Sequence, residues 1–336
     1  MNRRSLILTV GLAPLLAAPA LAPSRAHASL APLLQRATAL EPLRAIAIWQ
    51  AGAEIAARGY HGFSPDSPTN IKSASKSIVS ALAGIAIDRG LLEGPDQPIA
   101  PILRQDLPAN PDPRINQITL GHLLSMQAGL ERQSGANYGR WVNSRNWVQS
   151  ALAAPFTQNP GGQMQYSTAS THLVAAVLTR VTGRPLLQVA REWLGPIPGF
   201  AITGWDRDPQ GIYLGGNQMA MSTRSLLAFG ATYAQGGRAG GQQVVPAAWI
   251  ADSWRSRTAS VFSGQGYGYG WFIGQIGGRD VRYGWGYGGQ MVYVFPASGR
   301  QPASVVAITS DPDQPSARTG YRNELHQLAG ELVRAA

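Results

Sequence analysis

The two ends of the chain carry the alternating pattern of β-strands, and the middle carries helical patterns. Alternation occurs at 44–49 and 53–58, and strand-like segments return at 267–276, 281–285, 290–295 and 304–310. Strands that belong to one sheet must come together in space, so both ends of the chain are expected to contribute to a single sheet. The pattern predicts an α+β fold: an antiparallel sheet flanked by helices, with an inserted helical domain.

Between the strand regions, several segments place apolar residues at the spacing of one helix face. The clearest runs from Ser73 to Asp88, with Gly90 as its stop. Further helices are predicted at 118–126, 147–153, 167–182, 186–193, 223–233, 246–254 and 318–334. We therefore expect an α/β lobe formed by residues 40–85 and 225–336, and an inserted helical lobe formed by residues 86–224. A cleft between two such lobes is a common place for a functional site.

The first 28 residues resemble an export signal. Arg3 and Arg4 precede an apolar stretch, 6–22, which prolines interrupt, and residues 26–28 form a small-x-small cleavage site. The stretch is too short and too broken for a membrane span. The arginine pair also fits a twin-arginine signal, with an ordinary secretory signal as the alternative. We expect a signal peptide at 1–28, a mature domain at 29–336, a periplasmic or secreted location, and no stable membrane insertion after cleavage.

Composition bears on the class of protein and on its partners. With 44% hydrophobic and 14% charged residues, the 336-residue chain can bury a large core, and without Cys that core must stabilise the fold unaided by disulfides. The net charge of +10 comes mostly from scattered arginines without basic runs, which favours a solvated surface over nucleic-acid binding. The five His residues form no H-E-x-x-H motif or cluster, so a metal site has little support.

The sequence does not support two other functional sites, the nucleophile elbow of an α/β-hydrolase and a dinucleotide-binding loop. The G-x-S-x-G nucleophile elbow of α/β-hydrolases is absent. Residues 284–289 match G-x-G-x-x-G, but they lie between strand-like segments and no helix follows, so the dinucleotide interpretation fails and a hairpin turn is preferred.

An S-x-x-K motif marks the start of the predicted helix at Ser73. Ser73 and Lys76 are three residues apart, so they lie one turn apart on the same helix face, where hydroxyl and amine can meet. A serine at a helix N-terminus also gains from the positive end of the helix dipole as negative charge develops. Burial would favour the neutral amine of Lys76, which could then take the serine proton.

The use of lysine in this chain strengthens the motif. Of 28 cationic residues only Lys72 and Lys76 are lysines, and arginine cannot serve as a base because its guanidinium does not deprotonate in proteins. The alternative is structural: Ser73 caps the helix and Lys76 is solvated. A short motif of this kind needs support from elsewhere in the sequence.

Tyr166 is a candidate for that support. It lies in a glycine-rich loop just before the helix that runs to Thr182. From there its phenol could share a proton with Lys76 and pass it to a leaving group. The alternative interpretation is a packed tyrosine beside its neighbouring helix.

Taken together in order, these motifs resemble those of the serine hydrolases related to class C β-lactamases. That family includes penicillin-recognising peptidases, esterases and aminohexanoate-oligomer hydrolases. Ser73-Ala-Ser-Lys76 resembles the first family motif, Tyr166-Ser-Thr168 resembles the second, usually Y-x-N, and 284–287 resembles the third. Three lesser stretches, 118–125, 205–221 with its glycine pair, and 268–271, also fit in order, so the resemblance covers about Ala45 to Ile308.

The resemblance implies a β-lactamase/penicillin-binding-protein-like fold and a role for each matching residue. It also implies that no cofactor is needed. Ser73 would attack a carbonyl and form an acyl-enzyme, with Lys76 as general base and Tyr166 as proton relay. The backbone N–H groups of Ser73 and Tyr287 would form the oxyanion hole. The predicted substrate-binding residues are Thr168, Trp285, Gly286 and Gly288.

Two departures from the family pattern affect the expected substrate. Thr168 replaces the usual Asn; it keeps a hydroxyl that can bond to Lys76 but loses an amide that can hold substrate. Gly284 stands where penicillin-recognising members carry the Lys or His that binds a substrate carboxylate. This absence disfavours true β-lactamase activity.

The leading hypothesis is therefore an exported esterase or amide hydrolase acting on a small ester, amide or peptide-like substrate. One alternative is a β-lactamase or D-amino-acid peptidase. Another is a non-catalytic ligand-binding protein on the same fold.

Overall fold

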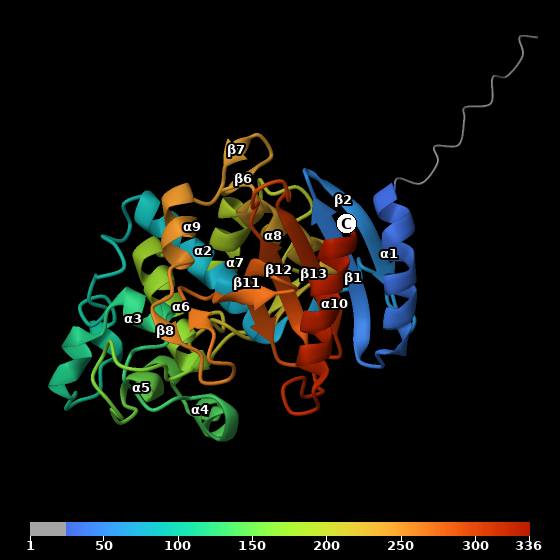
Figure 1. Ribbon diagram of the computed structural model, residues 1–336. Coiled ribbons are helices and arrows are strands. Elements are labelled where there is room, and N and C mark those ends of the chain that lie inside the picture. Colours follow the sequence, from blue (N-terminus) through green and yellow to red (C-terminus); the bar gives the residue numbers. More distant parts are fainter. Residues whose placement is uncertain (1–24) are drawn as a thin grey trace, which may run out of the picture.

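The computed structural model describes residues 25–336, which Figure 1 shows in the colours of the sequence. The first helix, α1 (Arg25–Arg36), begins within the predicted signal peptide, and the rest of that segment, 1–24, lies outside the described residues. The signal peptide and its cleavage after residue 28 therefore stay predictions. Within the described part of the chain, no helix is both long and apolar enough to cross a membrane.

An eight-stranded sheet joins the two ends of the described chain. Its strands are β1 (Leu43–Gln50), β2 (Ala53–Gly59), β8 (Thr258–Ala259), β9 (Gly266–Tyr267), β10 (Phe272–Ile276), β11 (Arg279–Gly286), β12 (Gln290–Phe295) and β13 (Ser304–Ser310). They lie in the order β2-β1-β13-β12-β11-β10-β9-β8, and every neighbouring pair is antiparallel. Ala47 of β1 pairs with Ala307 of β13, so segments about 260 residues apart are neighbours in one sheet.

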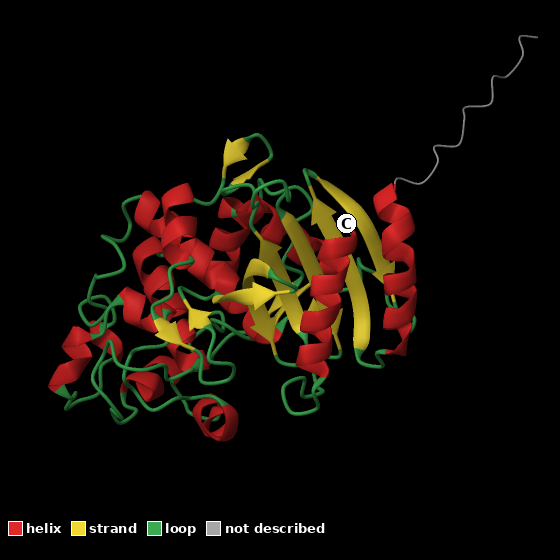
Figure 2. Cartoon of the chain, in the orientation of Figure 1, coloured by secondary structure: helices red, strands yellow, loops and turns green. Residues whose placement is uncertain are grey.

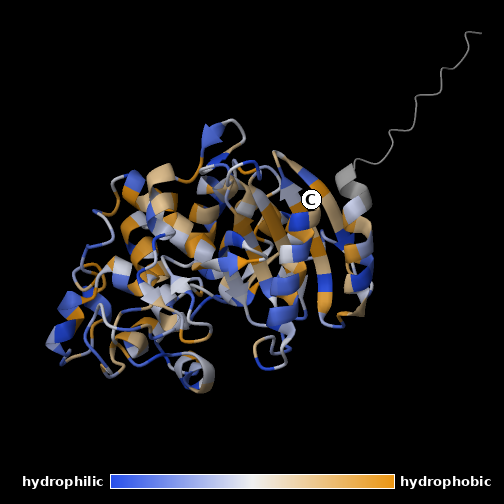
Figure 3. Cartoon of the chain, in the orientation of Figure 1, coloured by the Kyte–Doolittle hydropathy of each residue, from blue (hydrophilic) through white to orange (hydrophobic). Residues whose placement is uncertain are grey.

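Both faces of the sheet are covered, and its central strands β12 and β13 are buried along their whole length, on both faces. On one face, α1 and α10 (Tyr321–Ala335) pack over a core that includes Tyr293 and Ile308. On the other face, α8 (Thr223–Ala234) packs against β12 and β13 over Val292 and Ala307. Figure 3 shows the apolar residues gathered in these central strands. The structure confirms the predicted α+β class and antiparallel sheet.

The remaining helices form the other side of the molecule, as Figure 2 shows. They are α2 (Ser75–Asp88), α3 (Leu120–Leu124), α4 (Tyr138–Val142), α5 (Trp147–Leu152), α6 (Thr168–Thr182), α7 (Leu186–Trp193) and α9 (Ala247–Ser253). Short 3₁₀ turns cover Ala37–Ala39, Lys72–Ala74, Arg104–Asp106, Pro113–Gln117 and Gly135–Asn137. Residues 86–224 contain α3 to α7, and the division into two lobes with those bounds stays a prediction.

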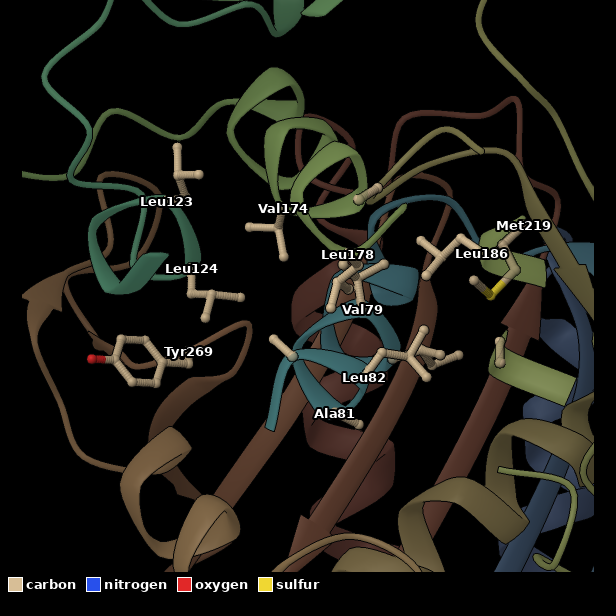
Figure 4. Close-up of a cluster of buried hydrophobic side chains, with 14 of the residues drawn as sticks. Val79, Ala81, Leu82, Leu123, Leu124, Val174, Leu178, Leu186, Met219 and Tyr269 are labelled. Carbon is tan, nitrogen blue, oxygen red and sulfur yellow. The ribbon is translucent and has the colours of Figure 1, made fainter. Parts of the chain in front are cut away.

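Helix α2 is the centre of this second core. It is buried from Ser75 to Ala86 and packs against α6, α7, α9 and β11. Figure 4 shows Val79 and Leu82 of α2 among side chains from α3, α6 and α7. A helix that is apolar on nearly every side belongs in the interior, so the site that starts at its N-terminus rests on a rigid support.

Two small sheets lie outside the main one. One contains β3 (Thr69–Asn70), β5 (Met219–Met221) and β4 (Gly204–Trp205), in that order, and the other pairs β6 (Arg238–Ala239) with β7 (Gln242–Gln243). The first places the turn before Ser73 beside the segment that leads into β5, because Asn70 pairs with Ala220.

Three of the predicted boundaries differ from the structure at places where a local backbone feature is the reason. The segment 267–276 is two strands, because Gly270 adopts φ +79° and its carbonyl accepts a hydrogen bond from Ser77 of α2. Ser73 lies in a 3₁₀ turn, and the α-helix begins at Ser75. The closing helix begins at Tyr321 instead of residue 318, after Gly320 at φ +85°.

Candidate active site

Ser73 lies in a tightly held turn at the entrance to α2. The preceding residue, Lys72, has φ +49°, in the left-handed region that side chains rarely adopt. The Asn70 side-chain oxygen accepts the Lys72 N–H at 2.9 Å, and the Ile71 N–H donates to the Met219 carbonyl at 2.8 Å. Contacts from β3 and β5 thus hold the backbone on which Ser73 sits, as expected of a positioned nucleophile.

Lys76 meets Ser73 as the sequence predicts. Its Nζ lies 3.0 Å from Ser73 Oγ, and the side chain is only 2% exposed. Burial lowers the pKa of Lys76 from its ordinary value of 10.5 to about 7, because the charged ammonium loses its hydration. A substantial fraction of the amine is therefore neutral near pH 7, which a base for Ser73 requires.

Lys76 has a second acceptor that the sequence analysis missed. Its Nζ donates to the carbonyl oxygen of Gly216 at 2.7 Å, from the loop between β4 and β5. A Cβ at Gly216 would lie 2.7 Å from Lys76 Cγ and 3.0 Å from Nζ, and the residue has φ +79°. Only glycine fits there without strain. The glycine pair at 215–216 was visible in the sequence, but a backbone acceptor has no side-chain signature.

Tyr166 also reaches Ser73. Its phenol shares a hydrogen bond with the Ser73 hydroxyl, and its ring centroid lies 5.1 Å from Lys76 Nζ. Burial raises the pKa of Tyr166 to about 12, and the hydrogen bond to Ser73 opposes this rise in part. The phenol is protonated at neutral pH and suits a relay better than a base. Amine and phenol thus converge on the serine oxygen.

Thr168 lies beside Ser134. Its hydroxyl pairs with Ser134 Oγ at 3.0 Å, and its backbone N–H donates to the same oxygen at 2.8 Å. Among the described contacts it makes no hydrogen bond to Lys76, whose Nζ contacts Ser73 Oγ and the Gly216 carbonyl. The first turn of α6 leaves donors unpaired, and Ser134 satisfies one of them.

A cavity of about 620 Å³ opens beside Ser73. Five of the predicted site residues line it: Ser73, Tyr166, Thr168, Trp285 and Tyr287. Further lining residues include Tyr138, Phe262, Arg132 and Arg318, and no Asp or Glu is among them. The cavity is therefore aromatic with a cationic rim, a composition suited to an apolar group near a carbonyl.

Gly286 and Gly288 do not line this cavity. A Cβ at Gly286 would lie 2.2 Å from the Ile71 carbonyl oxygen, and one at Gly288 would lie 2.2 Å from that of Asp311. These glycines allow β11 and its turn to approach neighbouring backbone closely. Their predicted role in substrate binding stays a prediction.

The proposed oxyanion donors have backbone N–H groups available. Tyr287 follows the last pair of β11 with β12, Gly286 with Gln290. Within residues 25–336, neither the Ser73 nor the Tyr287 N–H donates to another backbone group outside regular elements. Both residues line the same cavity, which is the arrangement an oxyanion hole needs.

A side chain at Gly284, where penicillin-recognising relatives carry a cation, would crowd its neighbours. A Cβ there would lie 2.9 Å from Ser77 Oγ and 3.0 Å from Val292 Cγ1. Strand β11 therefore packs directly on α2, and the neighbouring Trp285 faces the cavity instead. Among the described residues, no group of three or more His, Asp or Glu is arranged to hold a metal ion.

Solved structures with similar folds include hydrolases. The chain aligns with EstCE1, a hydrolase with promiscuous acyltransferase activity, at a TM-score of 0.74 and 19% identity, covering 92% of this chain and 98% of that one. A putative 6-aminohexanoate-dimer hydrolase from Bacillus anthracis aligns at 0.71 and 17% identity, covering 89% and 80%. At these identities the likeness concerns the fold, and it confirms the predicted β-lactamase/penicillin-binding-protein-like architecture.

Sequence comparison identifies the family. The 6-aminohexanoate-dimer hydrolase of Paenarthrobacter ureafaciens is 26% identical over 222 residues, which cover 59% of this chain and 54% of that protein. The chain thus spans about half the length, or less, of the curated relatives it matches. Residues 38–331 match the family model described as Beta-lactamase. The chain therefore belongs to the Beta-lactamase family, as its three ordered motifs predicted.

Proposed function

We propose that this protein is a serine hydrolase that cleaves an ester or amide bond through an acyl-enzyme on Ser73. Neutral Lys76 takes the hydroxyl proton as Ser73 Oγ bonds to the substrate carbonyl carbon. The N–H groups of Ser73 and Tyr287 stabilise the oxyanion. As the intermediate collapses, the bond to the leaving group breaks, and the proton passes from Lys76 through Tyr166 to that group. Water then hydrolyses the acyl-enzyme by the same route.

One observation carries this proposal: a buried amine with a pKa of about 7 lies 3.0 Å from a serine hydroxyl. A structural lysine gains nothing from such burial, because desolvation of its charge is costly. A buried lysine whose charge is disfavoured beside a hydroxyl is the arrangement that activates a nucleophile. The hydrolases with a similar fold support the same class of reaction.

Esters of apolar acids are the favoured substrates. Phe262, Trp285 and Tyr287 line the cavity beside Ser73 and offer apolar surface for an acyl group. The carboxylate-binding cation of the third family motif is missing, because Gly284 stands at its position and a side chain there would crowd Ser77 and Val292.

A β-lactamase or D-amino-acid peptidase remains the second candidate on one observation. Arg132 and Arg318 line the cavity, and among the described contacts neither guanidinium pairs with a carboxylate. Either arginine could receive a substrate carboxylate in place of the missing motif cation.

The proposal is tested with Ser73→Ala and a fluorophosphonate probe. We expect the wild type to hydrolyse p-nitrophenyl butyrate and to carry the probe on Ser73, and Ser73→Ala to lose roughly 10³-fold or more in rate. Ser80→Ala is the matched control, because Ser80 is buried in α2 and donates to the Tyr269 carbonyl, away from the cavity. Full activity in Ser73→Ala would reject the mechanism. A wild type that neither hydrolyses p-nitrophenyl butyrate nor binds the probe would favour a non-catalytic protein.

A chromogenic cephalosporin and a D-alanyl peptide, assayed in parallel, decide between the esterase or amide hydrolase and the β-lactamase or D-amino-acid peptidase.

We also propose that the protein is exported to the periplasm or beyond, on the sequence of residues 1–28 alone. Intact mass measurement of the protein from a periplasmic fraction tests this, and a chain that keeps its first 28 residues in the cytoplasm contradicts it.

A further inference from the structure

A fully buried His–Asp pair joins α6 to the loop that contacts Lys76. His172 Nε2, from α6, lies 3.0 Å from Asp208 Oδ2, from the loop between β4 and β5, and both side chains have no exposure. The rings of Trp141 and Trp147 pack edge-on against the imidazole, with centroids 5.5 and 5.7 Å away. Neither His172 nor Asp208 touches Ser73, and the mechanism above does not use them.

The hydrogen bonds of His172 define its tautomer. The Gly215 backbone N–H donates to His172 Nδ1 at 3.4 Å, so that nitrogen must present a lone pair. The proton of the neutral ring is therefore on Nε2, where it donates to Asp208. The other oxygen of Asp208, Oδ1, accepts the N–H groups of Gln210 and Ile212 at 2.9 and 2.8 Å. The Asp208 carboxylate thus holds the His172 imidazole through Oδ2 and the backbone of its own loop through Oδ1.

This chain of contacts ends at the catalytic base. Gly215 is followed directly by Gly216, whose carbonyl accepts from Lys76 Nζ at 2.7 Å. A Cβ at Gly215 would lie 2.2 Å from the Thr171 carbonyl, so the glycine pair is pressed against α6 as well. The Gly215 N–H and the Gly216 carbonyl belong to the peptides on either side of the one that joins the two glycines, so this two-residue segment is held by His172 at one end and by Lys76 at the other.

We propose that His172 and Asp208 are positioning residues for Lys76. By holding the Gly215 N–H, they fix the Gly216 carbonyl, which binds one amine hydrogen so that the lone pair points at Ser73 Oγ. This inference rests on the proposed function of Lys76 as the base. A purely structural role for the pair is a weaker account, because an apolar pair of similar volume is often at least as stabilising in a buried site.

Asp208→Asn is the sharpest test of the proposal. The Asn oxygen can keep the bonds to Gln210 and Ile212, but its NH₂ faces His172 Nε2, which must then accept. The ring proton moves to Nδ1, opposite the Gly215 N–H, and the backbone bond is lost. We expect kcat for p-nitrophenyl butyrate to fall about 10- to 100-fold with KM changed less than about twofold.

A second pair of variants serves if Asp208→Asn fails to fold. His172→Asn offers an oxygen near the place of Nδ1 and should retain more kcat than His172→Leu, which has no acceptor. Val174→Ala, in the same helix and fully buried, is the control for lost core packing, and it should lower the melting temperature while kcat is kept.

The tautomer gives a readout that does not require activity. Long-range ¹H–¹⁵N spectra of the wild-type protein should show the His172 proton on Nε2, and those of Asp208→Asn should show it on Nδ1. The proposal is overturned if the wild type has the proton on Nδ1, if Asp208→Asn keeps its kcat, or if kcat in all variants merely follows thermal stability. Failure of the proposed function is seen separately, as undiminished activity in Ser73→Ala.

Discussion

At the scale of single residues, the chemistry depends on how one amine is desolvated. Lys76 is nearly inaccessible, and the reason its pKa falls is burial; no neighbouring cation is needed. Tyr166 is partly buried beside Phe262, Tyr267 and Phe272, and burial pushes its pKa the other way, to about 12. The same physical cause thus separates the proposed base from the proposed relay, because one group is charged when protonated and the other when deprotonated.

The pH dependence of the reaction follows from Lys76. Only the neutral amine can accept the Ser73 proton, and the amine is neutral above its pKa of about 7. We therefore expect kcat/KM for a neutral ester to rise with pH, with an apparent pKa of about 7, and then to level off. Tyr166→Phe should lower the rate and keep this acid limb in place. A limb near the ordinary lysine value of 10.5 would show that Lys76 is not the group that titrates.

The residues of the site differ in how far the sequence could predict them. Ser73 and Lys76 were predictable, because a spacing of three fixes neighbours on a helix whatever the tertiary structure. Tyr166 was a candidate because of its place in a glycine-rich loop before a helix, and the family motif strengthened that prediction. Gly216 was not predictable as a partner, since its carbonyl reaches Lys76 across 140 residues and any residue type has a carbonyl. Thr168 was predicted to bind substrate, and its contact with the Ser134 hydroxyl, 34 residues away, had no signal in the sequence.

At the scale of elements, long periodic segments were predicted well and short ones were missed. Helices α6 and α7 and strands β12 and β13 match the predicted ranges within a residue, because their apolar periodicity is set by burial. Strands β3 and β5 have two and three residues, too few for any periodicity. These short strands nevertheless position the nucleophile turn and the loop that holds Lys76.

That loop, between β4 and β5, yields a prediction for Gly216→Ala. The new methyl group would lie 3.0 Å from Lys76 Nζ and 2.7 Å from its Cγ, so the loop or the lysine must move. We expect kcat to fall about 10-fold or more, because the Lys76 amine loses both its hydrogen-bond acceptor and its orientation toward Ser73. Gly211→Ala is the matched control: it lies in the same loop at φ +86° with open space around the new atom. Equal losses in both variants, measured with p-nitrophenyl butyrate, would attribute the effect to backbone strain alone.

At the scale of the whole molecule, the site depends on contacts between distant parts of the chain. Strand β1 pairs with β13, and α2 follows the β1–β2 hairpin into a core formed by residues from 47 to 307. Tyr166 and Gly216 come from the helical side, and Tyr287 comes from the sheet. The order of strands and helices along the chain predicted that both ends would share one sheet. It could not predict the cavity, which is formed by side chains from at least four separate segments.

The free energy of unfolding should also depend on pH through the buried Lys76 amine. Between pH 7 and 10.5 the unfolded chain holds a proton at Lys76 that the folded chain largely lacks, so the folded state gains stability as pH rises, by at most about 1.4 kcal/mol per pH unit. At and below pH 7 the penalty for the buried amine is fully present. Lys76→Met removes this titration together with activity. Its stability relative to the wild type, from urea unfolding, should therefore be most favourable near pH 7 and should decline toward pH 10. Lys72→Met, at the chain's other lysine, is the control for loss of a cation. If the stability difference between Lys76→Met and the wild type is the same at pH 7 and at pH 10, the lowered pKa of Lys76 is contradicted.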